Sequence, residues 1–80
     1  MTQRMGRPPG LTPDGPEIKR LRVDLGLTAA QLALRVGLHP KTVMAIESAD
    51  QRVSDVTASR LAKALGVEVG DIASPAGVAA

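Results

Sequence analysis

The sequence contains no cysteine and no aromatic residue, and these absences remove several classes of function. Without cysteine there is no disulfide, no thiolate metal ligand and no cysteine nucleophile. One histidine and scattered carboxylates do not match the spacing of a metal site, so we expect neither a metal nor another cofactor. Because unpaired bases usually stack on aromatic side chains, single-stranded nucleic acid is a poor candidate ligand.

Long apolar runs and catalytic motifs are missing as well. No run approaches the roughly 18 residues that a membrane span needs, and the N-terminus lacks the apolar region of a secretory signal. We therefore expect a soluble, cytoplasmic protein. The sequence shows no Ser/His/Asp set, no phosphate loop and no metal-ligand spacing, which predicts that the chain is not an enzyme.

The 80 residues carry a net charge of only +2, but the charges are unevenly distributed. Residues 1–45 hold seven basic and three acidic side chains, whereas residues 46–80 hold three basic and five acidic ones. A basic front and an acidic back are typical of small DNA-binding domains. Scattered solvated charges would give the same counts, so composition leaves both interpretations open.

Proline, glycine and small residues set the expected domain boundaries. Residues 1–15 contain three prolines and three glycines and show almost no apolar periodicity, so we expect a flexible N-terminal arm. Residues 74–80 are small and uncharged and predict a flexible tail. The folded domain is expected over residues 16–73, where the apolar spacing follows helices and no strand-like alternation is visible.

The predicted fold class is all-α, a compact domain of four to five helices. The first helix is expected to begin at Pro16, to bury Ile18, Leu21 and Leu25, and to end at Gly26.

The fourth helix is expected to be capped by Ser54 or Asp55 and to end at Gly66. A fifth turn around residues 69–73 is left open because Gly70 weakens it. The fourth helix carries the apolar residues Val56, Leu61, Ala62 and Leu65.

The second and third helices form the most informative part of the chain. Thr28 and Gln31 predict a capping box that opens the second helix, and Gly37 ends it. The third helix is expected to begin with Pro40 directly after His39. So short a link forces the two helices to cross at a steep angle, as in a helix-turn-helix. The predicted inner residues of this unit are Leu32, Ala33, Val36, Val43, Ile46 and Glu47.

Lys41, Met44, Ala45 and Ser48 share the opposite, outer face of the third helix. An exposed helix of this length fits the major groove of DNA.

The segment 27–38, with the pattern Leu-Thr-x-x-Gln-Leu-Ala-x-x-Val-Gly-Leu, resembles the lambda-repressor-like helix-turn-helix family, also called the XRE family. The resemblance continues through Thr-Val-x-x-Ile-Glu at residues 42–47 and Arg-Leu-Ala-Lys-Ala-Leu-Gly-Val at residues 60–67, and it covers roughly residues 18–72. It implies a five-helix domain that binds operator DNA, commonly as a homodimer, as in phage and bacterial repressors and in antitoxins.

The resemblance makes residues 40–49 the recognition helix. It places Pro40, Lys41, Met44 and Ala45 against the groove and Thr42 near a phosphate. It also implies that Arg22 and Glu47 form a buried ion pair, to which we assign a structural role.

The start of the second helix, Thr28 and Ala29, is expected to approach a phosphate. The family often has a polar residue at the second of these positions, whereas Ala29 offers only its backbone amide. The loop after the third helix also departs from the family, with Ala49 and Asp50 where Gly and a basic residue are usual. Lys41 is the single strong donor on the outer face, so direct base readout is expected to be sparse.

Five further residues are candidates whose roles the sequence leaves open. Gly6-Arg7-Pro8 resembles the centre of an AT-hook, so Arg7 or Arg4 is either a minor-groove contact or part of a solubilising leader. His39 either caps the third helix, which we favour, or touches a phosphate. Arg35 is either a phosphate contact or a solvated charge, and for Arg52 we favour a phosphate contact.

The sequence therefore predicts a transcriptional regulator that reads double-stranded DNA. The alternative is a protein-interaction module of the same fold, an antitoxin or adaptor that binds a toxin or another regulator. The thin, partly apolar outer face of the third helix keeps this alternative open.

Overall fold

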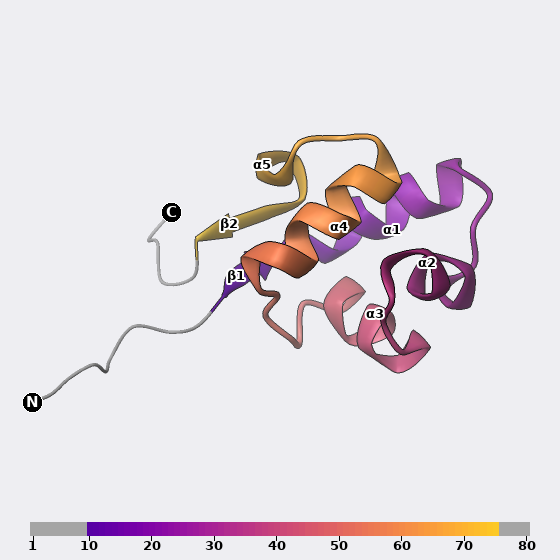
Figure 1. Ribbon diagram of the computed structural model, residues 1–80, viewed down its shortest axis with the longest axis horizontal. Coiled ribbons are helices and arrows are strands. Elements are labelled where there is room, and N and C mark those ends of the chain that lie inside the picture. Colours follow the sequence, from indigo (N-terminus) through magenta and orange to yellow (C-terminus); the bar gives the residue numbers. More distant parts are fainter. Residues whose placement is uncertain (1–9, 76–80) are drawn as a thin grey trace, which may run out of the picture.

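The computed structural model describes residues 10–75, which form five helices and a small two-stranded sheet (Figure 1). The elements follow one another as β1 (Leu11–Pro13), α1 (Gly15–Asp24), α2 (Ala29–Val36), α3 (Pro40–Glu47), α4 (Asp55–Leu65), α5 (Val69–Ile72) and β2 (Ala73–Pro75). The predicted helical class is confirmed, and the open fifth turn is present as α5.

A single core joins the helices. α2 packs against α3 and α4, and α1 packs against α3 and α4, so that α2 and α3 form one end of the domain (Figure 1). The largest side chains that are fully buried come from all five helices and are aliphatic, as the lack of aromatic residues requires. They are Ile18, Leu32, Val43, Ile46, Leu61 and Ile72.

The capping residues begin and end the helices largely as the sequence predicts. Thr28 accepts a hydrogen bond from the amide of Gln31 at 3.0 Å, and the Gln31 side chain accepts one from the amide of Thr28 at 2.8 Å. This reciprocal pair satisfies amides that have no partner inside the helix. At the far end of α2, Gly37 has φ of +73°, a conformation that costs glycine little. Of the two predicted caps of α4, the structure uses Ser54.

The small sheet corrects the expected domain boundaries. Leu11 lies opposite Pro75 in the antiparallel pair β1–β2, and it also exchanges backbone hydrogen bonds with Val53. The expected arm over residues 1–15 and tail over residues 74–80 are therefore wrong for residues 11–15 and 74–75. Three-residue strands are too short to show side-chain alternation, so sequence periodicity cannot indicate them. Residues 1–9 and 76–80 lie outside the described residues.

Two apolar residues are exposed where the helical pattern placed them among the core residues. Leu25, predicted to be buried, is 52% exposed and caps the end of α1 directly after its last residue, Asp24. Val56 is 62% exposed because it lies on the side of α4 opposite to Ala58, which is buried instead.

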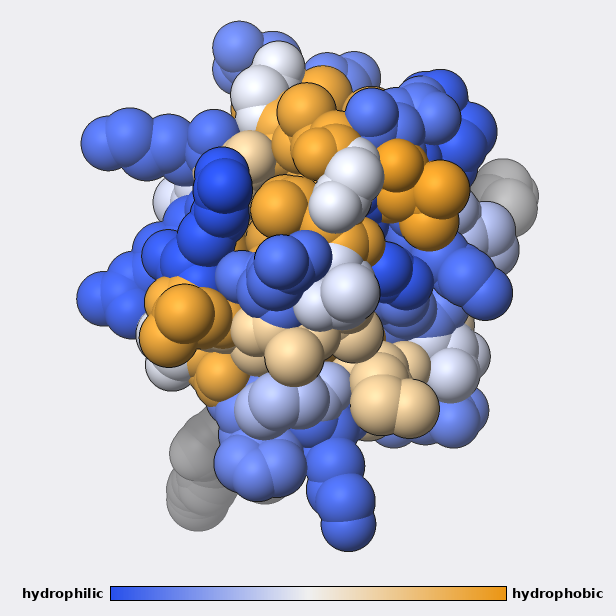
Figure 2. Space-filling model, turned by 90° about the vertical axis from the view of Figure 1, so that its right-hand side faces the viewer, coloured by the Kyte–Doolittle hydropathy of each residue, from blue (hydrophilic) through white to orange (hydrophobic). Residues whose placement is uncertain are grey.

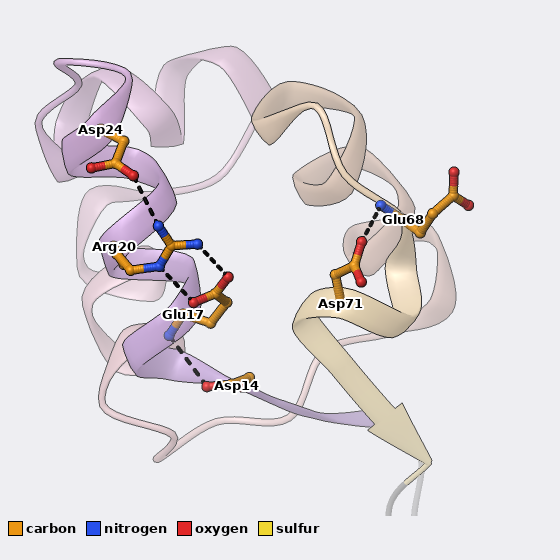
Figure 3. Close-up of polar contacts among 6 residues, drawn as sticks. All are labelled: Asp14, Glu17, Arg20, Asp24, Glu68 and Asp71. Carbon is orange, nitrogen blue, oxygen red and sulfur yellow. Dashed lines mark hydrogen bonds and ion pairs between the residues drawn. The ribbon is translucent and has the colours of Figure 1, made fainter.

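Polar contacts on the exposed side of α1 hold the helix at its beginning and along its length (Figure 3). The Asp14 carboxylate accepts a hydrogen bond from the amide of Glu17 at 3.2 Å, so α1 begins one residue before Pro16. Arg20 bridges Glu17 at 2.7 Å and Asp24 at 3.0 Å. The hydrogen bond from Arg20 lowers the pKa of Glu17, although the carboxylate remains in contact with solvent. These contacts stabilise α1, and all of their partners lie in α1 or directly before it (Figure 3).

Candidate nucleic-acid interface

The helix-turn-helix geometry depends on how residues 37–39 connect α2 to α3. Gly37 turns the chain, Leu38 packs half-buried against the core, and His39 caps α3 by accepting a hydrogen bond from the amide of Lys41 at 3.1 Å. The predicted capping role of His39 is confirmed. Pro40 occupies the first turn of α3, as expected.

The two faces of α3 differ sharply in exposure. Val43 and Ile46 are each 1% exposed and fix the inner face in the core. On the outer face Lys41, Met44 and Ser48 are exposed, with Met44 at 57%. Three further candidates, Pro40, Thr42 and Ala45, are partly exposed beside them. The predicted outer face of the third helix is therefore available to a ligand.

The remaining candidates surround this face to different degrees. Thr28 is exposed and Ala29 is half-buried at the start of α2. Arg35 near the end of α2 and Arg52 in the α3–α4 loop are both exposed. Arg4 and Arg7 lie outside the described residues. The structure thus leaves the cationic flanks accessible, while a contact with DNA stays a prediction for each of them.

The predicted ion pair between α1 and α3 is confirmed. Arg22 donates from Nε to Glu47 Oε2 at 2.6 Å and from Nη2 to Glu47 Oε1 at 3.0 Å. Its third contact runs from Nη1 to the carbonyl oxygen of Leu27 at 2.8 Å. The side chains of Arg22 and Glu47 are only 12% and 8% exposed. This arrangement fixes α3 and the α1–α2 loop to one guanidinium group.

The surroundings of Arg22 favour its charged form. The hydrogen bond with Glu47 raises the pKa of Arg22, and burial opposes that shift without reversing it. A bidentate arginine–carboxylate contact is both stronger and more directional than a single hydrogen bond between neutral groups. The pair therefore holds a defined geometry behind the outer face of α3.

A cavity of about 310 Å³ opens where α1, α2 and α3 meet. It brings together Met44 of α3, Ser48 and the first residue of α2, Ala29. Ser48 caps the end of α3 and Ala49 has φ of +60°, so the expected helix over residues 40–49 is wrong for its last two residues. Lys19 from α1 also lines the cavity, a residue that the sequence analysis did not select. A signal was present, because Lys19 lies three residues before Arg22 and so on the same side of α1. The other lining residues are Arg22 and Glu47.

Within residues 10–75, no group of three histidine, aspartate or glutamate side chains is arranged to hold a metal ion. In the same part of the chain, no helix has both the length and the apolar character needed to cross a membrane. A second cavity, of about 380 Å³, lies between the small sheet, the start of α1 and α5, and Ala49 in the loop after α3 also lines it.

Comparisons with known proteins place this geometry in a family. The profile of the Helix-turn-helix family matches residues 18–72, which include all five helices except the first turn of α1. An uncharacterized HTH-type transcriptional regulator from Methanothermobacter thermautotrophicus (strain Delta H) is 43% identical over 51 residues. That match covers 64% of this chain and 74% of the archaeal protein.

Solved structures give the same result. The restriction-modification controller protein C.AhdI from Aeromonas hydrophila is 33% identical and superimposes with a TM-score of 0.67, over 71% of this chain and 86% of its own. SinR, a master regulator for biofilm formation whose structure was solved in complex with DNA, is 26% identical with a TM-score of 0.65. The likeness to SinR covers 70% of this chain and 90% of SinR. The chain described here belongs to the Helix-turn-helix family.

Proposed function

We propose that this chain is a transcriptional regulator that binds double-stranded DNA sequence-specifically, with α3 in the major groove. The observation that carries the proposal is the division of α3 into a core-fixed inner face and a free outer face. A helix held in this way can enter the groove without rearranging the domain. The chain is proposed to act as a homodimer in the cytoplasm, where the DNA of a bacterial or phage-infected cell lies.

Lys41 is the residue most suited to reading a base. It is exposed at the start of α3, and it forms no ion pair within residues 10–75. A lysine ammonium group can donate to O6 and N7 of guanine in the major groove. Thr42 and Ser48 add hydroxyl groups, while Met44 and Ala45 add apolar contacts.

Phosphate contacts are proposed for groups on both sides of α3. The hydroxyl of Thr28 already accepts a hydrogen bond from Gln31, so its remaining hydrogen is the group free to donate. Ala29 contributes its backbone amide, and the exposed Arg35 and Arg52 contribute charge. Arg4 and Arg7 are proposed to extend the contact from the N-terminal segment.

The proposal is tested by selecting bound duplexes from a randomised DNA pool at near-physiological salt and sequencing them. We expect an inverted repeat with half-sites about one helical turn apart, as two-fold symmetry of a dimer requires. Replacing Lys41 by alanine should then cost about 1–3 kcal/mol of specific binding and relax the preference at one base pair. Lys63→Ala, an exposed lysine of α4, is the matched control and should leave both unchanged.

The outcomes of the selection distinguish DNA binding itself from the residues that make the contact. No enrichment over the input pool, together with no salt-dependent binding, would reject the proposed function. Enrichment with an unchanged preference in Lys41→Ala would remove only Lys41 from the interface. Enrichment of AT-rich DNA without a repeat would shift the contact to Arg4 and Arg7 and to the shape of the minor groove.

A second candidate function, binding of a toxin or another regulator, is favoured by one observation. Apolar side chains interrupt the polar surface on the side where α1 ends and α2 lies (Figure 2). The exposed large residues of these helices include Val23 at 55%, Leu25 at 52% and Leu34 at 84%. Leu34→Glu should abolish binding of a protein partner and leave DNA binding intact if this surface is used.

A further inference from the structure

The cavity between α1, α2 and α3 has a composition that general DNA binding does not explain. Its lining joins two apolar residues, Ala29 and Met44, to the hydroxyl residue Ser48 and the cationic residue Lys19, beside the Arg22–Glu47 pair. We propose that it receives one thymine nucleotide of the bound duplex, with the C5-methyl group against Met44 and Ala29 and the phosphate held by Lys19. This inference rests on the proposed function and assigns Lys19 a role in it.

The apolar wall is the first reason. Met44 is 57% exposed and lines the cavity together with Ala29. Neither side chain has a donor or a strong acceptor, so neither can hydrogen-bond a base edge. The C5-methyl of thymine is the largest apolar group that the major groove presents. Of the four bases, thymine therefore suits this wall best.

The balance of charge is the second reason. Arg22 and Glu47 line the cavity, but their bidentate contact at 2.6 and 3.0 Å neutralises both charges. Lys19 is exposed and forms no ion pair within residues 10–75. It is thus the one uncompensated charge in the lining, and the cavity carries a net positive charge. A phosphate complements that charge, whereas a neutral or cationic group would not.

The size of the cavity is the third reason. A volume of about 310 Å³ exceeds the ~30 Å³ of one water molecule several times over, so a methyl group alone would leave it mostly filled with solvent. One nucleotide can place its methyl group against the apolar residues Met44 and Ala29 and its phosphate against Lys19. The rigid ion pair beneath them keeps the walls of α1 and α3 at a fixed separation.

The experiment uses the full chain and the duplex selected from the randomised pool, in which each thymine is replaced by uracil in turn. Uracil lacks only the C5-methyl group, so the exchange removes one apolar contact and changes no hydrogen bond. One position in each half-site should lose about fourfold in affinity, the ratio that corresponds to ~0.8 kcal/mol for a buried methyl. Met44→Ala should abolish the difference between thymine and uracil at that position, and Met44→Leu should retain most of it.

Lys19→Ala tests the phosphate contact separately. It should make the negative slope of log affinity against log salt shallower by about 0.9 and leave the thymine–uracil ratio unchanged. Leu34→Ala and Lys63→Ala remove exposed side chains outside the cavity lining and should change neither quantity. Both residues under test are exposed, so loss of folding is not expected.

The results distinguish this inference from the proposed function. A wild-type chain with clear sequence preference but no thymine–uracil difference at any position would overturn the inference and leave the proposed function standing. A difference that persists in Met44→Ala, or an unchanged salt slope in Lys19→Ala, would also overturn it. Failure of the wild-type chain to bind any duplex would reject both.

Discussion

Removal of the Glu47 carboxylate is the most informative perturbation of this domain. Glu47→Ala leaves the guanidinium group of Arg22 in a site where its side chain is only 12% exposed. Two charge-assisted hydrogen bonds are lost, and the contact from Nη1 to the carbonyl oxygen of Leu27 remains. A buried charge without its partner typically costs about 3–5 kcal/mol. The cavity above the pair admits water to Arg22, so we expect a value near 3 kcal/mol.

The effect is measured by thermal and urea unfolding followed by circular dichroism. A loss of about 3 kcal/mol corresponds to a decrease in Tm on the order of 10–20 °C for a domain of this size. The urea midpoint should fall without a change in the slope m, because the surface exposed on unfolding is nearly the same. Asp50→Ala, which removes an exposed carboxylate three residues away, should stay within about 0.5 kcal/mol of the wild type.

A double substitution distinguishes the cost of losing the ion pair from the cost of leaving Arg22 charged and buried without a partner. Arg22→Met combined with Glu47→Leu removes both charges and keeps apolar volume, so it should be markedly more stable than Glu47→Ala. The reasoning is refuted if Glu47→Ala melts at the wild-type temperature. Water would then solvate Arg22 as well as Glu47 does, and the pair would add nothing to the free energy of unfolding.

Three further predictions concern single residues of the scaffold. Gly15→Ala should destabilise the domain by about 1–3 kcal/mol in a urea titration, because the added Cβ would fall on the backbone carbonyl of Glu47; an unchanged midpoint would contradict this close approach. Ala49→Gly should raise stability by about 0.5–1 kcal/mol, since Ala49 has φ of +60° and glycine relieves that strain; a lower Tm would show that chain entropy outweighs the strain. Arg20 lowers the pKa of Glu17 in the folded state. The stabilisation of the fold by the Glu17 carboxylate is therefore complete above the ordinary pKa of 4.5, and it is lost as the pH falls through the lower pKa of the folded state. The Tm gap between wild type and Glu17→Gln should therefore be present at pH 7 and absent near pH 2, and a gap that widens in acid would refute the sign.

The helix-turn-helix was predictable because each of its parts is set by local chemistry. The capping box of Thr28 and Gln31, the turn at Gly37 and the proline at the start of α3 act over a few residues. Their geometry does not depend on the rest of the chain, so the sequence alone defined both helices and the outer face of α3. The Arg22–Glu47 pair could be predicted only from the resemblance to a family, because 25 residues separate the two partners and no local pattern connects them.

The features that the sequence did not reveal depend on contacts between distant segments. Strand β1 exists because Leu11 meets both Pro75 and Val53, and no pattern within three residues can indicate that. Leu25 follows the helical spacing of a buried residue, but α1 ends at Asp24 and the Leu25 side chain is exposed. The spacing of Lys19 and Arg22 places both on one side of α1, but that Lys19 lines a cavity with α2 and α3 follows only from the packing of these helices.

The division of α3 explains why stability and recognition can be tested apart in so short a helix. Its inner residues, Val43, Ile46 and Glu47, are held by the core and by the ion pair, so substituting them changes folding first. Met44 contacts the cavity from the exposed side, so substituting it changes the ligand surface and little else. A loss of DNA binding in Glu47→Ala without a loss in Met44→Ala would therefore assign the binding defect to misplacement of α3. The reverse result, a loss in Met44→Ala at an unchanged Tm, would assign it to the surface that α3 presents.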